Sequence, residues 1–236
     1  MITLRRAEER GHGNHGWLSS FHTFSFADYY DPKHMGFRAL RVLNDDRVAP
    51  GMGFGAHGHR DMEIISYVLE GKVAHKDSTG ENAVLGPNEV QVMTAGTGVI
   101  HSEFNGSSTE PVHFLQIWIL PNEEDLRPSY QQFAYDPAEK RGKLRLIAAP
   151  SGVTGDGVGK LNQDARIYAS VLAAGEKIDY EIPAGRHAWV HCSEGNITVN
   201  GIPFKEGDGA AVSDEDSLSF VGAGDQGGEF LIFDLA

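Results

Sequence analysis

The chain has 236 residues, of which 33 are acidic and 20 are basic, and its formal net charge is −13. This acidity, without a basic run, argues against nucleic acid or an anionic membrane surface as the main partner. A single cysteine, Cys192, excludes an internal disulfide and cysteine-rich zinc sites and suits a reducing compartment. No apolar stretch follows the first arginines as a secretory signal would, and no apolar run is long enough to span a bilayer. We therefore expect a soluble, cytoplasmic protein with no membrane partner.

The N-terminal segment is rich in glycine, histidine and aromatic residues at irregular spacing. We interpret it as loops and cover for the part of the chain that follows, because no regular apolar period runs through it. The histidines concerned are His12, His15, His22 and His34, and the aromatic residues predicted to cap the first barrel are Phe21, Phe24, Phe26, Tyr29 and Tyr30.

Short runs of β-type sequence, separated by turn residues, dominate the rest of the chain. The 29 glycines and the scarcity of amphipathic helical segments favour an all-β barrel or sandwich architecture. The best helical candidate is the stretch from Asn122 to Gln132, which begins with the acidic NEED and predicts a short helix or turn. The predicted strands cover residues 37–43, 63–70, 72–77, 89–95, 112–120, 143–149, 166–172, 177–182, 188–193, 196–200 and 229–235.

Two dyads of polar residues predict a metal site: His57 and His59 in FGAHGHRDME, and His101 and Glu103 in GVIHSEFN. Side chains two residues apart on a strand point to the same face, so two such dyads on neighbouring strands can direct three imidazoles and one carboxylate at one point. This donor set is typical of a first-row transition metal, and four protein ligands leave two positions open on an octahedral ion. Glu63, four residues after His59 and in phase with it, is an alternative carboxylate ligand.

Polar residues on adjoining strands are candidates to orient the ligands, and the nearest are Asn105, Gln116 and His113. The alternation in VHFLQIWIL places Gln116 on the same face as Phe114 and His113 on the opposite face. At most one of Gln116 and His113 can therefore face the cavity.

A polar segment over residues 127–142, containing two prolines, separates two β-rich halves and predicts domains over residues 1–130 and 131–236. A weak internal repeat supports two domains of the same kind, because YVLEGKVAHKD around Gly71 is similar to VHCSEGNITVN around Gly195.

The second half lacks the residues for another three-histidine site. In the alignment of the repeat, Glu181 and Pro183 take the positions of the first histidine dyad, and no histidine or cysteine follows Cys192. His187 and His191 have no partner dyad after them, so we interpret them as ordinary core or surface histidines. The metal site is expected in the N-terminal domain alone.

The first-half motifs resemble those of cupin proteins, with Gly51, His57, His59, Glu63 and Gly71 in the first motif and Gly98, His101 and Asn105 in the second. The whole chain resembles the pirin family of two-barrel cupins, through RGHGNHGWLSSFHTFSFADYYDP near its start and HRDMEIISYVLEGKVAHKDS in the first barrel. The resemblance implies an all-β fold of two cupin-type jelly-roll barrels, the first with a metal site and the second without. The metal ligands of pirins fall on His57, His59, His101 and Glu103, which favours Glu103 over Glu63 as the carboxylate ligand.

The resemblance also implies an activity, because pirins are similar to the flavonol dioxygenases and some have quercetin 2,3-dioxygenase activity. The expected protein is an oxidoreductase that takes a small aromatic flavonol and O2 and opens the flavonol with loss of carbon monoxide. Glu103 would be its catalytic base. One divalent transition metal ion per chain is expected. Fe(II) is the leading candidate, and Mn, Co, Ni, Cu and Zn also suit the ligands.

The alternative function is regulatory. Pirins are reported to bind transcription factors in eukaryotes and metabolic enzymes in bacteria, which implies a metal with a structural or redox-sensing role and a protein partner. The acidic chain would make no direct contact with nucleic acid.

Overall fold

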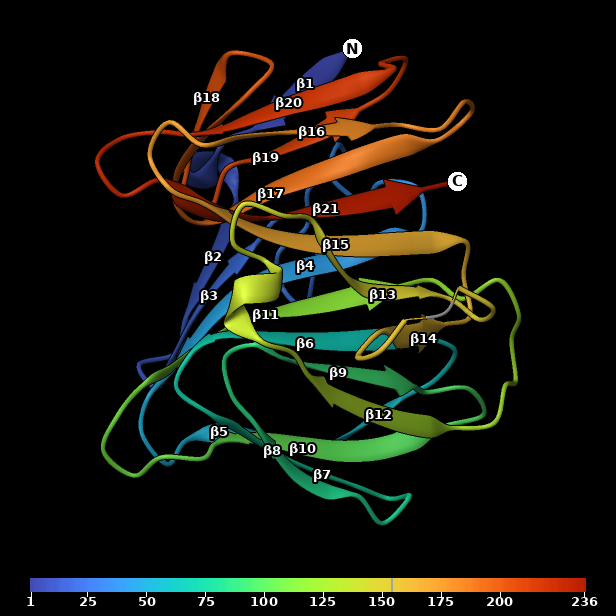
Figure 1. Cartoon of the computed structure of the whole chain (residues 1–236). Coiled ribbons are helices and arrows are strands. Elements are labelled where there is room, and N and C mark those ends of the chain that lie inside the picture. Colours follow the sequence, from blue (N-terminus) through green and yellow to red (C-terminus); the bar gives the residue numbers. More distant parts are fainter. Residues whose placement is uncertain (154) are drawn as a thin grey trace. The chain divides into compact units, whose positions relative to one another are not determined.

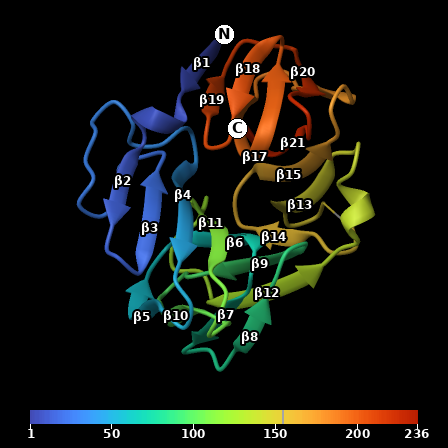
Figure 2. The same ribbon diagram turned by 90° about the vertical axis from the view of Figure 1, so that its left-hand side faces the viewer.

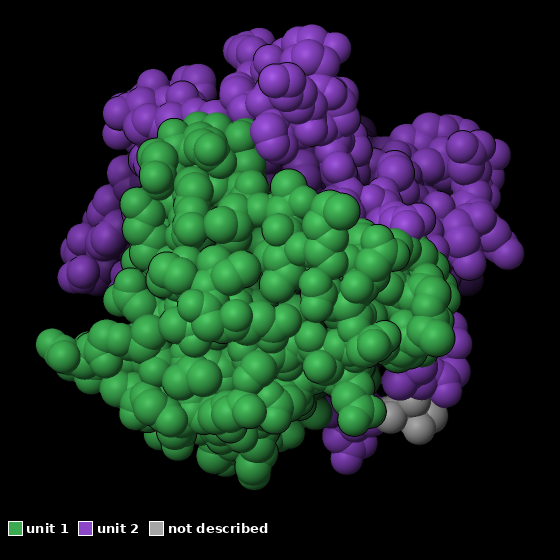
Figure 3. All heavy atoms as spheres, turned by 90° about the horizontal axis from the view of Figure 1, so that it is seen from above, with its two compact units in different colours: residues 1–10, 136–149, 164–236 green, residues 11–135, 150–163 purple. Residues whose placement is uncertain are grey.

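The computed structural model describes residues 1–153 and 155–236. Its secondary structure is strand apart from two short 3-10 helices, η1 (Ala7–Glu9) and η2 (Pro137–Glu139), as Figure 1 shows, so the all-β prediction is confirmed. The chain divides into two compact units, which Figure 3 colours separately. Unit 1 comprises residues 1–10, 136–149 and 164–236, and unit 2 comprises residues 11–135 and 150–163. Among the described residues, no helix has the length and apolar character needed to cross a membrane.

Unit 2 contains a seven-stranded and a four-stranded antiparallel sheet (Figures 1 and 2). Across the larger sheet the strands are β12 (Ser129–Ala134), β9 (Glu89–Thr94), β6 (Glu63–Glu70), β11 (Val112–Ile119), β4 (Leu40–Val48), β3 (Leu18–His22) and β2 (Gly11–Asn14). Across the smaller sheet they are β5 (Gly53–His59), β10 (Val99–Asn105), β7 (Val73–Asp77) and β8 (Asn82–Leu85). The short strand β14 (Gly159–Leu161) also belongs to this unit.

The two sheets of unit 2 pack face to face through a shared apolar core. One buried cluster joins Val68 and Phe114 of the larger sheet to Val73 and Leu85 of the smaller one. Strand β10 shows the alternation that this packing requires, because every second residue from Val99 to Asn105 is buried. Burying apolar side chains from both sheets stabilises this arrangement by about 25 cal/mol for each Å² removed from water.

Strand β4 is longer than the sequence predicted. The predicted strand ended at Leu43, whereas β4 continues through Asn44, Asp45 and Asp46 to Val48, and these three polar residues are buried. The extension is held from both sides, because β4 pairs with β3 and with β11 along this stretch. A polar sequence thus forms the inner part of a central strand.

The helix or turn predicted over residues 122–132 is wrong in its second half. Residues 122–125 form bends, with Asp125 at a φ of 57°, and residues from Ser129 onward form β12. The backbone of β12 pairs with β9 throughout, and the carbonyl of Leu126 accepts a hydrogen bond from Thr97 N. These partners outweigh the weak helical preference of an acidic segment.

Unit 1 is a second antiparallel β structure. Its main sheet runs through β1 (Ile2–Arg5), β19 (Gly209–Val212), β17 (His187–Val199), β21 (Gly228–Leu235), β15 (Ala165–Leu172) and β13 (Arg145–Pro150). Further strands β16 (Lys177–Glu181), β18 (Ile202–Lys205) and β20 (Ser217–Gly222) pair with one another or with β17. Its core is apolar and includes Cys192, whose thiol pKa is raised by burial first and by nearby carboxylates second. Cys192 is therefore a packing residue and not a reactive thiolate.

Candidate metal centre

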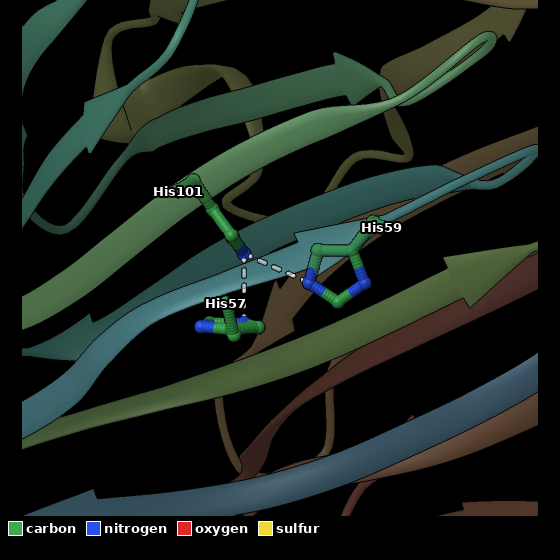
Figure 4. Close-up of side chains that lie close together, drawn as sticks. All are labelled: His57, His59 and His101. Carbon is green, nitrogen blue, oxygen red and sulfur yellow. Dashed lines mark hydrogen bonds between the residues drawn. The ribbon is translucent and has the colours of Figure 1, made fainter.

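Three histidine nitrogens converge at one point of unit 2. His101 Nε2 lies 2.9 Å from His59 Nε2 and 3.0 Å from His57 Nε2, and Figure 4 shows the three rings pointing toward one another. The cause is the antiparallel register of β5 and β10, which places His101 opposite His57 and Val99 opposite His59. The prediction that these two strands are neighbours and direct their histidines to one face is thus met by the geometry.

A glycine allows β5 to approach β10 closely. A Cβ on Gly53 would lie 2.4 Å from the carbonyl oxygen of Glu103 and 2.4 Å from the Cα of Phe104, and both are backbone atoms. Only glycine fits there without moving one strand away from the other. The spacing of the histidines therefore depends on a residue with no side chain, four positions before His57.

The three rings are suited to hold a cation through their lone pairs. His57 Nδ1 donates to the carbonyl oxygen of Gly55 at 2.8 Å, which leaves Nε2 of that ring as the lone-pair atom. Burial, followed by the neighbouring histidines, lowers the pKa of His59 to about 4 and that of His101 to about 3. Both rings are therefore neutral at physiological pH, as metal ligation requires.

The spacing of the nitrogens agrees with ligation of one ion. Neighbouring donors on an octahedral ion with metal–nitrogen bonds of about 2.1 Å lie about 3.0 Å apart. The two measured separations, 2.9 and 3.0 Å, are close to that value. The residues present thus fit a divalent transition metal held by imidazole.

Glu103 is buried, and two hydrogen bonds hold its side chain beside the three histidines. Its Oε1 accepts from Ser66 Oγ at 2.9 Å and its Oε2 accepts from Gln116 Nε2 at 2.6 Å. The pairing of β10 with β5 shifts between His101 and Glu103, because β5 runs from His57 to Phe54 over the same stretch, whereas β10 keeps its alternation and buries both His101 and Glu103. Glu103 groups within 4.8 Å with His101 and His75, and it lines the same cavity as His57.

The alternative carboxylate, Glu63, is used elsewhere. Its carboxylate accepts from Thr94 Oγ1 at 3.1 Å and from the backbone and side-chain nitrogens of Asn162 at 3.3 and 3.2 Å. In the part of the chain that the structure describes, no group of metal-ligating side chains includes Glu63. The structure thus assigns Glu63 to anchoring the segment over residues 150–163.

Of the three predicted orienting residues, Gln116 alone contacts a predicted ligand. Asn105 Nδ2 donates to the carbonyl oxygens of Val48 and Glu110, and His113 Nε2 lies 2.8 Å from Asp45 Oδ1. Gln116 lines the cavity and His113 does not, as the alternation along β11 predicted.

A further dyad behind the site was not identified from the sequence. His75 Nε2 lies 2.9 Å from Asp77 Oδ2 in β7, where His75 pairs with Glu103 and Asp77 with His101. The His75 ring lies 5.4 Å from the His101 ring. The signal was present in KVAHKD, since His75 and Asp77 have the same two-residue spacing as the dyads that were recognised.

A cavity of about 300 Å³ adjoins the histidines. Its polar lining includes His57, His59, Glu103 and Gln116, and its aromatic lining comprises Trp17, Phe26, Phe54 and Trp118. The remaining lining residues are His15, Leu18, Ser20, His22, Ala27, Asn44 and Asp46. Such a cavity, lined by aromatic side chains together with convergent polar groups, is typical of a small-molecule site.

The interpretation of the N-terminal segment as loops and cover is correct only in part. His22 lies on β3 and is buried, and both His22 and His15 line the cavity, as does Phe26. The antiparallel pairing of β2 with β3 and of β3 with β4 makes this segment a structural wall of the site. The irregular spacing of its glycines and histidines concealed two strands.

Unit 1 offers no comparable centre among its described residues. His191 is buried on β17, and His187 Nδ1 lies 2.8 Å from Ser213 Oγ. Both histidines therefore serve the packing and hydrogen bonding of their own unit.

Known proteins are similar to this chain over its whole length. The Pirin family model matches residues 3–119, and the quercetinase C-terminal cupin domain matches residues 146–235. A quercetin 2,3-dioxygenase of Escherichia coli K12 is 48% identical over 235 residues, which cover 100% of this chain and 99% of that protein. A pirin-like protein of Caulobacter vibrioides is 36% identical over 236 residues, which cover 100% of both.

A solved structure is also similar. The crystal structure of the bacterial pirin YhhW from Escherichia coli in complex with nickel(II) matches with a TM-score of 0.92 and 47% identity. The match covers 100% of this chain and 99% of that one.

Proposed function

The chain belongs to the pirin family of cupin proteins, and from that premise we propose that it is a metal-dependent dioxygenase that opens flavonols such as quercetin with O2 and releases carbon monoxide. The observation that supports this most is the convergence of His57, His59 and His101 at one end of an aromatic cavity of about 300 Å³. A quercetin 2,3-dioxygenase that is 48% identical over the full chain supports the same reaction.

The metal would be held by His57, His59 and His101, with Glu103 as the fourth ligand. Support for Glu103 comes from its place in the cavity and its grouping with His101. When bound, a divalent metal would supply Lewis acidity and a route for electrons between flavonol and O2. Fe(II) is our leading candidate for the native ion. Nickel is a second candidate, since the related YhhW was solved in complex with nickel(II).

Glu103 is the base in this proposal. A flavonol must lose the proton of its 3-hydroxyl before it can donate electrons, and a buried carboxylate at the metal can accept that proton. Ser66 and Gln116 each donate to one oxygen of Glu103, which fixes the orientation of its carboxylate. Each carboxylate oxygen has a further lone pair for the substrate proton or the metal.

The aromatic walls would hold the flat substrate and exclude water from it. Trp17 and Phe54 meet edge to face with ring centroids 5.4 Å apart, and Phe26 and Trp118 do so at 5.3 Å. Such edge-to-face pairs have fixed positions and offer flat apolar area to a ligand. The same walls keep bulk water away from a reactive, deprotonated ring.

The direct test is gas exchange. Metal-loaded protein should consume O2 in the presence of quercetin and release carbon monoxide, whereas chelated protein should do neither. A flavone without the 3-hydroxyl should be inert, because it has no proton for Glu103 to accept. If protein loaded with Fe, Mn, Co, Ni or Cu shows no turnover above free metal in any case, the dioxygenase is excluded and partner binding becomes the better hypothesis.

The Glu103→Gln variant distinguishes the role of Glu103 as a base from its role as a metal ligand. The amide keeps the size and one oxygen donor, but it removes the charge and the basicity of the carboxylate. We expect kcat to fall by about a hundredfold or more, as for loss of a general base, while metal content falls much less. Metal content is measured by elemental analysis on the samples used for kinetics. Equal losses of metal and of kcat would mean that Glu103 acts only as a ligand.

A further inference from the structure

The wall of the cavity that belongs to the seven-stranded sheet has polar residues that the proposed chemistry does not use. Ser20 on β3 pairs with Asp46 on β4, and His22 pairs with Asn44, so the four side chains lie on one face of two adjacent strands. All four line the cavity that also contains His57. They lie on a different sheet from the three histidines, which belong to β5 and β10.

Within this wall, Asp46 has an acceptor atom without a partner. Asp46 is 3% exposed, the hydroxyl of Ser20 donates to its carboxyl group, and Oδ1 is buried without a hydrogen bond in the described part of the chain. A buried carboxyl oxygen without a donor is destabilising, so such atoms normally have a hydrogen-bond partner when the protein is at work.

The neighbouring carboxyl shows what a satisfied aspartate on this strand looks like. Asp45 accepts from Arg47 at 2.9 Å and contacts His113 Nε2 at 2.8 Å. Asp45 does not line the cavity, because adjacent residues of a strand point to opposite faces. Asp46 is thus distinguished by facing a space that a ligand can enter.

The other polar side chains of the wall constrain what the ligand offers. His22 Nδ1 lies 3.0 Å from Asn44 Oδ1 and 3.4 Å from Ser20 Oγ, so these side chains contact one another. Asp46 Oδ1 is the buried atom of these four residues that has no hydrogen-bond partner in the described part of the chain, and because it is an acceptor, the matching ligand group is a hydroxyl donor. The aromatic side chains that line the same cavity favour a hydroxyl in the plane of a ring, which is a phenol.

We propose that Asp46, supported by Ser20, determines flavonol specificity by accepting a hydrogen bond from a phenolic hydroxyl outside the 3-hydroxy-4-keto pair that faces the metal. This inference rests on the proposed function, since it takes the occupant of the cavity to be a flavonol. It predicts that the protein distinguishes polyhydroxylated flavonols from flavonols with the 3-hydroxyl alone.

The test compares two ligands that share the chelating pair. Quercetin has further hydroxyls and 3-hydroxyflavone has none, and both should quench the fluorescence of Trp17 and Trp118 in the cavity. Binding is titrated anaerobically with metal-loaded protein, so that affinity is measured without turnover. Wild-type protein should bind quercetin at least about tenfold more tightly, which corresponds to one buried hydrogen bond. Equal affinity for the two flavonols would overturn the inference without any variant.

Three variants locate the preference. Asp46→Leu should abolish the preference for quercetin: its affinity for quercetin should fall about tenfold, and its affinity for 3-hydroxyflavone should change less than about twofold. Asp46→Asn should reduce the preference, since an amide oxygen is a weaker acceptor. Asp45→Asn, the same substitution on the other face of β4, should leave the ratio of the two affinities unchanged. The Asn variant is nearly isosteric and remains informative if the Leu variant does not fold. A ratio unchanged by Asp46→Asn, or changed equally by Asp45→Asn, overturns the inference.

Oxygen uptake by the same samples keeps the two proposals separate. One outcome is that the protein turns over both flavonols with a ratio of the two rates that is the same in wild type and in the Asp46 variants. That result would overturn the specificity inference and leave the proposed dioxygenase reaction standing. A preference for quercetin that depends on Asp46, without any oxygen uptake, would support the recognition role and exclude the proposed reaction.

Discussion

At the scale of single residues, Asp46 is a carboxyl group that is almost completely removed from water. Burial raises the pKa of this carboxyl to about 7, the charges of Asp45 and Glu103 act in the same direction, and the hydrogen bond from Ser20 opposes them. Among the described residues that line the cavity, the basic ones are all histidines. An ionised Asp46 therefore costs stability in the absence of a ligand.

The cost predicts how the stability of Asp46→Asn depends on pH. The pKa of Asp46 rises from an ordinary 3.8 to about 7 on folding, so between these values the folded chain holds a proton that the unfolded chain has released. Stability from this group therefore falls as pH rises through that range. The stability of Asp46→Asn minus that of wild type should increase from pH 5 to pH 8, by on the order of 1 kcal/mol or more. Urea unfolding at the two pH values measures it.

A matched control is Asp179→Asn, whose exposed carboxyl has a pKa lowered by hydrogen bonds from Ser219 and Lys177. The Asp179 carboxyl is ionised in the folded and the unfolded chain across pH 5 to 8. The stability of Asp179→Asn minus that of wild type should therefore not change over this range. A flat difference for Asp46→Asn as well would show that its carboxyl is not penalised by burial.

The sequence predicted some of these residues and not others, for physical reasons. The sequence predicted one site for His57, His59 and His101, because side chains two residues apart on a strand point to the same face. The same rule placed Glu103 on the face of His101, and β10 keeps that alternation, but the shift in the pairing with β5 between His57 and Phe54 had no clear sequence signal. Asp46 could not be found, because an acidic segment is not typical of a buried strand.

At the scale of elements, the centre depends on how closely β5 lies to β10. Gly53 faces backbone atoms of Glu103 and Phe104, whereas a Cβ at Gly55, two residues along the same strand, would meet nothing within 4 Å. The two glycines thus lie two residues apart on one strand and have opposite steric surroundings.

This difference predicts opposite results for two alanine substitutions. Gly53→Ala should push β5 away from β10, separate the histidines and reduce metal occupancy severely, with a loss of stability of about 2 kcal/mol. Gly55→Ala should be neutral or slightly stabilising, because alanine restricts the unfolded chain without a clash. Elemental analysis and thermal unfolding of both variants provide the measurements. Similar metal contents in the two would mean that strand spacing does not control the site.

The strands were predicted well where the apolar pattern is strong, and poorly where pairing with a neighbouring strand determines their bounds. Residues 63–70 form β6 with the predicted bounds. The Glu-Gly pair at Gly71 ends a strand as expected, but the pair at Gly195 lies inside β17, which continues from His187 to Val199. There Gly195 adopts a φ of 66° and the pairing with β21 shifts, so the predicted turn is a local irregularity of one long strand.

At the scale of the whole chain, each unit recruits a segment from outside its main span. In unit 1 the N-terminal strand β1 pairs with β19, with Leu4 opposite Ala210, and Arg6 forms an ion pair with the buried Asp208. In unit 2 the segment over residues 150–163 is anchored by Asn162 on Glu63. No local pattern in MITLRRAEER or around Asn162 predicts these partners, because they are fixed by pairing across more than ninety residues.

The distribution of ligating residues over the two units predicts one metal ion per chain. Both groups of side chains able to hold an ion share His101 and belong to unit 2, so wild-type protein should contain one equivalent. Replacing His57 and His101 by alanine should abolish binding, because one histidine and Glu103 remain and metal affinity depends on the full donor set. Replacing His187 and His191 by glutamine should leave one equivalent, with circular dichroism showing that the fold is retained.

Thermal stability gives a second measurement on the same two double variants. Metal at 100 times its Kd should stabilise wild type and the second double variant, at His187 and His191, by about 2.7 kcal/mol. The first double variant, at His57 and His101, should not be stabilised at all. Metal content equal to wild type in the first variant, or lost from a folded second variant, would place the centre outside β5 and β10.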